Sequence, residues 1–211
     1  MTRIHWLSLA AMALGGCALT SKGETLDPHF FTPESVAVTQ AAAGAPKARG
    51  PLRLGRVRGA VSIKEKIIFR ESVYEVGYYE ERRWTEKPDV YLRRALAQAL
   101  FEEAGFAQTA SGTAPTLEAE LFAFEEIRGP KPFVRVGLTI LLREDDAALM
   151  EKTLVVEEPI VTLAGDAPTT PLVRAFSLAL TRTVSRTVDE TSRGTASLAS
   201  SSSAAATAAP K

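Results

Sequence analysis

The sequence predicts an α+β fold, a two-layer sandwich in which two amphipathic helices cover one face of an antiparallel sheet. Three observations lead to this prediction. Residues 66–70 and 76–85 are rich in β-branched and aromatic side chains, which is the composition of two strands joined by a short connection. Residues 116–157 hold three runs of alternating apolar and polar residues separated by turn sequences, which indicates a meander. Two further segments have apolar residues at helical spacing, each opening at a proline.

The first half of the predicted domain is a run of strands followed by a helix. Residues 52–60 form the first strand candidate, ahead of the strands at 66–70 and 76–85. Pro88 suits the first turn of a helix, because its fixed φ matches the helix and its missing N–H costs nothing there. The apolar stripe then falls on Leu92, Leu96, Ala99 and Leu100, and Gly105 can take the left-handed conformation that ends a helix.

The second half of the predicted domain is the meander and the second helix. Its strands are expected at 116–125, 133–143 and 149–157, with Phe122 and Phe124 on the outer face of the first. Thr170 is positioned to cap a helix that runs to about Asp189. Residues 191–211 are rich in Ser, Ala and Thr and are expected to be a disordered tail, so the domain is predicted to span residues 51–190.

A targeting segment is predicted at the start of the chain. Residues 1–16 hold one arginine and a short apolar run, the pattern of a signal peptide, and residues 17–50 are expected to be a lipidated N-terminus and linker. The run Leu14-Gly15-Gly16-Cys17 resembles the lipobox of bacterial lipoproteins, and Cys17 is the only cysteine. We therefore predict that Cys17 carries a thioether-linked lipid; the alternatives are a secreted or a cytosolic protein with a chance apolar start.

Composition disfavours most catalytic and nucleic-acid-binding classes. The 25 basic and 25 acidic residues balance, so no affinity for nucleic acid is expected. After the leader, His29 is the one histidine, which cannot build a structural zinc site with a single cysteine. Acidic pairs at 80–81, 125–126 and 157–158, with the run 144–146, are interpreted as solvated strand ends and turns, the alternative being a glycosidase pair. We expect no enzyme activity, no cofactor and no metal.

Aromatic residues and arginines alternate along the strand at 76–85. Strand periodicity would put Tyr78, Arg82 and Trp84 on one face and Tyr79 and Arg83 on the other. Trp84 is predicted to be structural, because it lies where the strand turns into the helix. Tyr78, Tyr79, Arg82 and Arg83 are the candidate partner-binding residues, since tyrosine and arginine are over-represented at interface hot spots.

The chain resembles the ABC-type transport auxiliary lipoproteins, outer-membrane lipoproteins that accompany MCE-type lipid transporters of the paraquat-inducible class. The resemblance is carried by the strand-ending pair Arg83-Trp84, the leucines Leu96 and Leu100 of a proline-started helix, and the closing pair Gly105-Phe106. Phe30 and Phe31 also resemble the short aromatic strand that follows the lipidated cysteine in that family; they are expected either to dock on the domain or to remain part of the tether.

The resemblance implies a function and a place. The chain would be a non-catalytic auxiliary subunit at the periplasmic face of the outer membrane, held there by its lipid anchor. Its partners would be an MCE-domain protein and the complex of ABC permease and ATPase, and a homo-oligomer is left open. The alternatives are an envelope assembly or maintenance lipoprotein without a transport role, and a hydrolase that uses an unrecognised carboxylate pair.

Overall fold

The computed structural model describes residues 26–34, 48–110 and 113–207. The predicted signal peptide and Cys17 lie outside the described residues, as does most of the predicted linker. The elements are β1 (His29–Phe31), β2 (Arg49–Gly59), β3 (Lys66–Arg70), β4 (Val76–Trp84), α1 (Pro88–Ala97), the π-helical turn η1 (Gln98–Glu103), β5 (Phe106–Gln108), β6 (Thr116–Ile127), β7 (Phe133–Glu144), β8 (Ala147–Pro159) and α2 (Thr170–Thr207).

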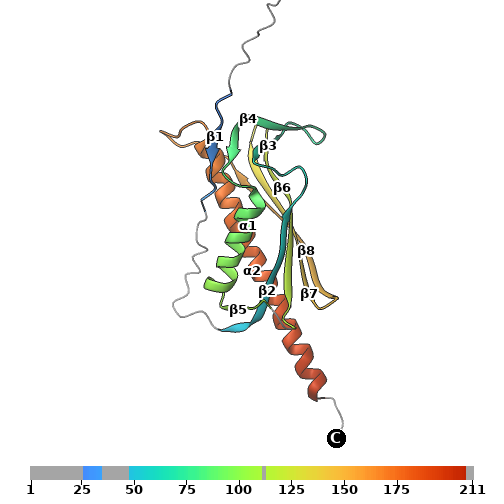
Figure 1. Ribbon diagram of the computed structural model, residues 1–211. Helices are drawn as coiled ribbons and strands as arrows, with labels where there is room; N and C mark the ends of the chain where they lie inside the picture. Colours follow the sequence, from blue (N-terminus) through green and yellow to red (C-terminus); the bar gives the residue numbers. More distant parts are fainter. Residues whose placement is uncertain (1–25, 35–47, 111–112, 208–211) are drawn as a thin grey trace, which may run out of the picture.

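Strand β6 is the branch point of an eight-stranded sheet (Figure 1). One edge of β6 pairs antiparallel with β7, which pairs antiparallel with β8, so the predicted meander is confirmed. The other edge is shared between two parallel partners. The first half of β6 pairs with β2, and its last residues, Glu125 to Ile127, pair with β3.

The prediction of a purely antiparallel sheet is therefore wrong. Strands β2 and β3 both run parallel to β6, while β1 runs parallel to β4 and β5 parallel to β2. Parallel neighbours need a long crossover connection. Here α1 and η1 lie in the chain between β2 and β3 on one side and β6 on the other. Sequence alternation reports which side chains share a face, and it does not report which strands become neighbours.

The two-layer sandwich is also wrong, because the forked sheet does not form one flat layer. One branch of the sheet continues from β6 through β3 and β4 to β1. Just after β1, the backbone N–H of Glu34 donates to the Ser177 hydroxyl of α2 at 2.9 Å, so this branch reaches the N-terminal part of that helix. Strands β7 and β8 lie along the rest of that helix. Helix α1 packs against β2 and α2, so the sheet curves around its helices (Figure 1).

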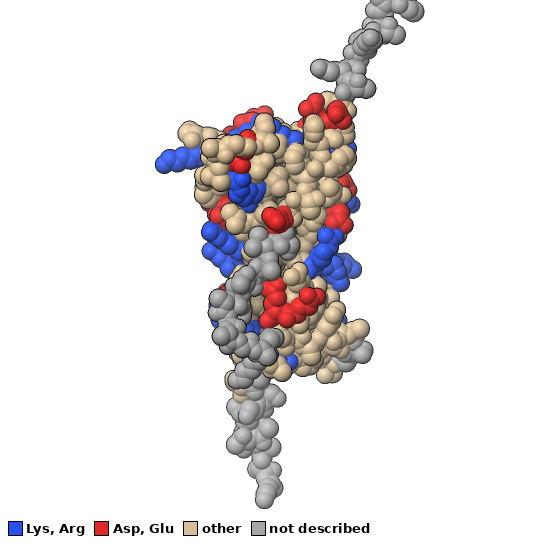
Figure 2. Space-filling view, turned by 90° about the vertical axis from the view of Figure 1, so that its left-hand side faces the viewer, with Lys and Arg blue, Asp and Glu red and all other residues tan. Residues whose placement is uncertain are grey.

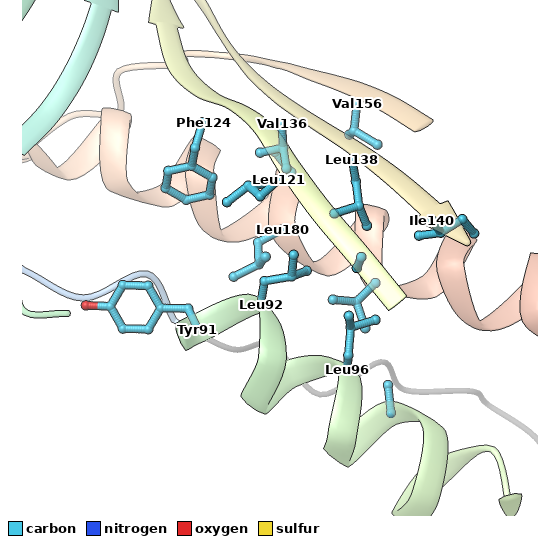
Figure 3. Packing of buried hydrophobic residues seen from close by; sticks show 14 of the residues in the cluster. Tyr91, Leu92, Leu96, Leu121, Phe124, Val136, Leu138, Ile140, Val156 and Leu180 are labelled. Atoms are coloured by element: carbon cyan, nitrogen blue, oxygen red, sulfur yellow. The ribbon is translucent and has the colours of Figure 1, made fainter. Parts of the chain in front are cut away.

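A single apolar core joins the sheet to both helices (Figure 3). Leu92 and Leu96 of α1 and Leu180 of α2 meet the aliphatic side chains of β6 and β7, all of them buried. Next to them, Trp84 makes edge contacts with Phe124 and Phe176, at centroid distances of 5.4 and 5.0 Å. Trp84 is 1% exposed, so its predicted burial is confirmed, and its ring contacts are with β6 and α2.

The predicted start and stop of the first helix are confirmed. Pro88 occupies the first turn, and Asp89 adds a negative charge there, which the helix dipole favours. The helix passes into the π-helical turn and closes at Gly105, which has a φ of 78°, a conformation that favours glycine. Phe106 then returns to the core and is 3% exposed.

A bulge in β6 moves one aromatic ring to the face opposite the predicted one. The register against β7 shifts between Leu121 and Ala123, so Phe122 is the extra residue. Before the shift the alternation holds, and after it the faces exchange. Phe122 is 41% exposed, as expected, whereas Phe124 is 1% exposed and lies in the core.

Helix α2 continues to Thr207, so the predicted disordered tail is helical from Thr191 onwards within the described residues. Thr183, Thr187 and Thr191 are each fully buried, and each hydroxyl donates to the carbonyl four residues earlier. These threonines therefore face the sheet without needing a partner from it. A Cβ on Gly194 would lie 2.9 Å from the Leu142 side chain of β7, which shows how closely the extension packs.

Candidate functional site

The aromatic and arginine side chains of β4 divide between two faces, but not as strand periodicity predicts. The register between β3 and β4 shifts between Lys66 and Ile68, so β4 carries extra residues in its middle. Tyr79 contacts Glu126, and Trp84 contacts Phe124, which lies two residues away on the same face of β6. The two side chains therefore share a face, and the predicted separation of Tyr79 from Trp84 is wrong.

Tyr79 is the centre of a compact group that we call the Tyr79 cluster: Phe69, Tyr79, Arg82, Glu126 and Arg128. The rings of Phe69 and Tyr79 meet edge to face at 5.1 Å. The guanidinium of Arg82 lies 4.4 Å from the centre of the Tyr79 ring, and that of Arg128 lies 3.4 Å from the centre of the Phe69 ring. Cations over aromatic faces are attracted by the ring quadrupole, and more strongly when water is excluded.

A glycine makes room for this cluster. Gly77 lies opposite Phe69 in the antiparallel pair of β3 and β4. A Cβ at this position would lie 2.3 Å from the Phe69 ring, closer than any real contact. The ring can therefore lie directly over the backbone of β4, where it meets Tyr79 and Arg128.

Hydrogen bonding and burial favour the protonated form of the Tyr79 hydroxyl. The Tyr79 hydroxyl donates to Glu126 Oε2 at 2.6 Å, and Glu126 is 9% exposed. Burial is the main reason that the pKa of Tyr79 is raised, and the hydrogen bond to Glu126 raises it further. Arg128 also forms an ion pair with Glu71, and its Nε lies 3.7 Å from Glu126. Arg82 is half-buried over the Tyr79 ring and forms the outer layer of the cluster.

The four predicted partner-binding residues do not meet at one point. Tyr79 and Arg82 are together in the cluster. Tyr78 lies on the opposite face, where its hydroxyl donates to the Ser62 carbonyl at 3.2 Å. Arg83 lies beside Phe30 of β1, and its buried Nε has no hydrogen-bond partner among the described residues.

Strand β1 covers one edge of β4. Its pairing is parallel and in register, with Phe30 beside Arg83 and Phe31 beside Trp84. Of the two interpretations of these phenylalanines, docking on the domain is therefore confirmed. Phe31 packs against the core, while Phe30 remains 58% exposed.

A hollow of about 520 Å³ lies between the end of β1 and the first turns of α2. Phe31, Val173 and Leu178 supply apolar walls, and Arg174 and Ser177 supply polar groups. Sequence reasoning missed this hollow, because it forms only when β1 docks beside a helix that lies more than a hundred residues later in the chain.

The acidic pair at 125–126 does not present its two carboxylates on one face of the sheet. Glu125 and Glu126 are successive strand residues and point to opposite faces of β6. Glu125 accepts two hydrogen bonds from Arg70, at 2.9 and 3.1 Å. Glu158 is 3% exposed and pairs with Arg182. The interpretation of these three carboxylates as solvated is therefore wrong: they are buried and balanced by arginines.

The remaining surface was searched for charged patches, metal ligands and membrane-spanning helices. Lysines, arginines and acids are interspersed on the face shown in Figure 2. Across residues 26–34, 48–110 and 113–207, no group of three His, Cys, Asp or Glu is arranged to hold a metal ion. Within the same residues, neither helix combines the length and the hydropathy needed to cross a membrane.

Comparison with known proteins identifies relatives of the fold. No protein-family model matches the sequence, and no curated protein matches it significantly. A DUF330 protein from Xanthomonas campestris superposes with a TM-score of 0.65 at 19% identity, covering 76% of this chain and 92% of that protein. An uncharacterised protein gives a TM-score of 0.56 at 10% identity, covering 78% and 98%.

A third, more distant similarity is to a minor lipoprotein from Acinetobacter baumannii. It has a TM-score of 0.40 at 9% identity and covers 62% of this chain and 94% of the other. At that level the superposition supports no inference about function. The chain thus shares its fold with the DUF330 protein of Xanthomonas campestris.

Proposed function

We propose that this protein is a lipid-anchored, non-catalytic auxiliary subunit of an MCE-type ABC lipid transport system, placed at the periplasmic face of the outer membrane. In this role Cys17 holds the domain at the membrane. The domain binds the MCE-domain protein, which works with an ABC permease and ATPase.

The observation that carries the proposal is the position of β1. Two separate parts of the sequence resemble the auxiliary lipoproteins: the aromatic pair Phe30-Phe31 and the strand-ending pair Arg83-Trp84. These four residues are paired neighbours in the sheet, Phe30 with Arg83 and Phe31 with Trp84. Residues that resemble one family in two distant segments, and that also pair in space, support membership more strongly than either segment does alone.

The lipobox-like run supports the anchor. Cys17 follows Leu14-Gly15-Gly16 at the end of a short apolar segment, and no second cysteine competes for modification. A diacylglyceryl group with a further acyl chain gives stable membrane attachment, because each buried methylene contributes about 0.8 kcal/mol.

The Tyr79 cluster supports a binding role on β4. Arg82 presents a guanidinium stacked on a tyrosine ring, a combination enriched at protein interfaces. The buried carboxylates nearby are held by arginines, which favours binding over catalysis.

The test is metabolic labelling with palmitate followed by copurification from membranes. The parent protein should incorporate label, fractionate with the outer membrane and copurify an MCE-domain protein. Cys17→Ser should abolish labelling and membrane fractionation. Label retained by the Cys17→Ser variant would refute the anchor, and a labelled protein that copurifies only assembly or maintenance factors would refute the transport role.

The contribution of β4 is tested with the same assay. Arg82→Ala removes the stacked guanidinium and should weaken binding of the partner by about 1–2 kcal/mol. The amount of partner recovered should fall accordingly. Arg56→Ala, an exposed arginine on β2, is the matched control and should leave recovery unchanged. Equal recovery from the two variants would remove Arg82 from the interface.

A further inference from the structure

Exposed apolar side chains gather at one end of the domain. Val73 and Tyr74, at the tip of the β3–β4 hairpin, are 78% and 95% exposed. Val161 and Leu163, in the connection from β8 to α2, are 55% and 53% exposed. Figure 1 shows that both segments lie at the upper end of the molecule, where the chain enters β1.

The opposite end lacks this feature. The β7–β8 turn and β5 lie toward the lower end in Figure 1. Among the described residues, neither of these segments carries a large exposed apolar side chain. These apolar loop tips thus lie at one end only, an arrangement that suits contact with an apolar or interfacial surface.

The charges within these loops are largely neutralised. Asp166 is the only charged residue in the connection at 160–169, and Arg174 binds its carboxylate at 2.6 Å. Asp166 Oδ2 also accepts the backbone N–H of Leu163 at 2.7 Å, which holds the loop in shape. In the hairpin, Glu71 pairs with Arg128, and Glu75 is the exposed exception beside Tyr74. Glu75 is thus the one carboxylate of these two loops without a partner among the described residues. Its charge favours contact at a polar surface over insertion into an apolar layer.

The length of chain outside the described residues indicates what this end faces. Leu26 is the first described residue and is nine positions after Cys17. Nine residues span at most about 30 Å when fully extended. Leu26, through which the chain enters this end of the domain, is therefore within about 30 Å of Cys17.

We propose that this end of the domain lies against the headgroup region of the membrane that holds the Cys17 anchor, with Val73, Tyr74, Val161 and Leu163 in contact with lipid. The inference rests on the lipid anchor of the proposed function. Tyrosine and aliphatic tips suit the membrane interface, where an apolar body meets a wet surface. The anchor supplies the affinity, and the tips fix the orientation of the domain.

The experiment uses the full-length protein, lipidated at Cys17 and reconstituted into vesicles of phosphatidylethanolamine and phosphatidylglycerol. Because lipidation consumes the only native thiol, a single new cysteine can carry an environment-sensitive fluorophore. The reporters are Tyr74→Cys and Leu163→Cys, and the control is Asp146→Cys in the exposed β7–β8 turn at the opposite end. Vesicles with brominated acyl chains then quench labels that touch lipid.

The expected result is that labels at 74 and 163 shift to the blue and are quenched several-fold more than the label at 146. Protein that floats with the vesicles while all three labels stay equally unquenched would overturn the inference and leave the anchor intact. Stronger quenching at 146 would overturn it too, by turning the opposite end to the membrane. Protein that does not float lacks the anchor, and the proposed function then fails together with the inference.

Discussion

Replacing Trp84 by alanine removes the ring through which β4 contacts both β6 and α2 in the core. The indole is 1% exposed and touches Phe124 of β6 and Phe176 of α2 edge to face. Truncation of a buried aromatic residue costs about 3–5 kcal/mol. Collapse of the cavity is hindered here, because Phe124 and Phe176 are themselves stacked at 4.5 Å. We therefore expect a loss near the upper value, about 4–5 kcal/mol.

The assay is urea unfolding of the chain without its first sixteen residues, followed by circular dichroism. In a thermal melt of the same chain, at about 2–4 °C per kcal/mol for a domain of this size, the melting temperature should fall by about 8–20 °C. Tyr74→Ala is the control, because that side chain is 95% exposed and should change stability by less than about 0.5 kcal/mol. A loss below about 2 kcal/mol for Trp84→Ala would refute the argument that this ring is the central contact between the sheet and α2.

Three further predictions concern the helix extension, a buried ion pair and a phenol. A chain that ends at Thr191 loses the contact of α2 with Leu142 and should be less stable by about 2 kcal/mol in the same urea assay, whereas a chain that ends at Ser200 keeps it. Arg70→Ala leaves the buried Glu125 without its main partner and should lower the free energy of unfolding by about 2–3 kcal/mol. This loss is below the usual range for a broken buried ion pair because Arg135 lies 3.8 Å from Glu125. The control is Arg58→Ala, which breaks the exposed pair with Glu120 and should cost less than about 1 kcal/mol. Burial raises the pKa of Tyr79 above its ordinary 10.0, so its contribution to stability is complete below pH 10 and lost as the pH rises through the raised value. The phenolate absorbance of the parent minus that of Tyr79→Phe should therefore rise only above pH 10.0. A difference in absorbance that titrates below pH 10.0 would contradict the prediction.

Elements with strong local patterns were predictable. Strand β3 has the predicted bounds, and β7 and β8 run within two residues of theirs, because alternation and turn residues define them locally. The start of α1 at Pro88 and the end of the helical segment, after η1, at Gly105 follow from backbone chemistry at single residues.

The errors have three physical sources. Parallel pairing of β2 and β3 with β6 is non-local, and no pattern within a strand reports it. Bulges in β4 and β6 shift the alternation by an amount that composition does not reveal, so Phe124 and Tyr79 lie on unexpected faces. The buried stripe of α2 mixes valines with threonines at 183, 187 and 191, and a threonine whose hydroxyl bonds to a carbonyl of the same helix can be buried although its side chain is polar.

The candidate site was half predictable for the same reasons. Aromatic and arginine enrichment on β4 pointed to Tyr79 and Arg82, which do lie together. The other members of the cluster, Phe69, Glu126 and Arg128, come from β3 and from the end of β6, and only the parallel pairing of these strands brings them to Tyr79.

The docked strand β1 also has a mechanical consequence. Only three residues of β1 pair with β4, so this is a short clasp between the body of the domain and the lipid anchor that we propose at Cys17. While the clasp holds, the leash between Cys17 and the domain has a contour length of about 30 Å. If it opens, the leash runs to β2 at Arg49, 32 positions from Cys17, and its contour length rises to about 110 Å. If Cys17 carries the proposed lipid, opening of this clasp would more than triple the reach of the domain from the membrane.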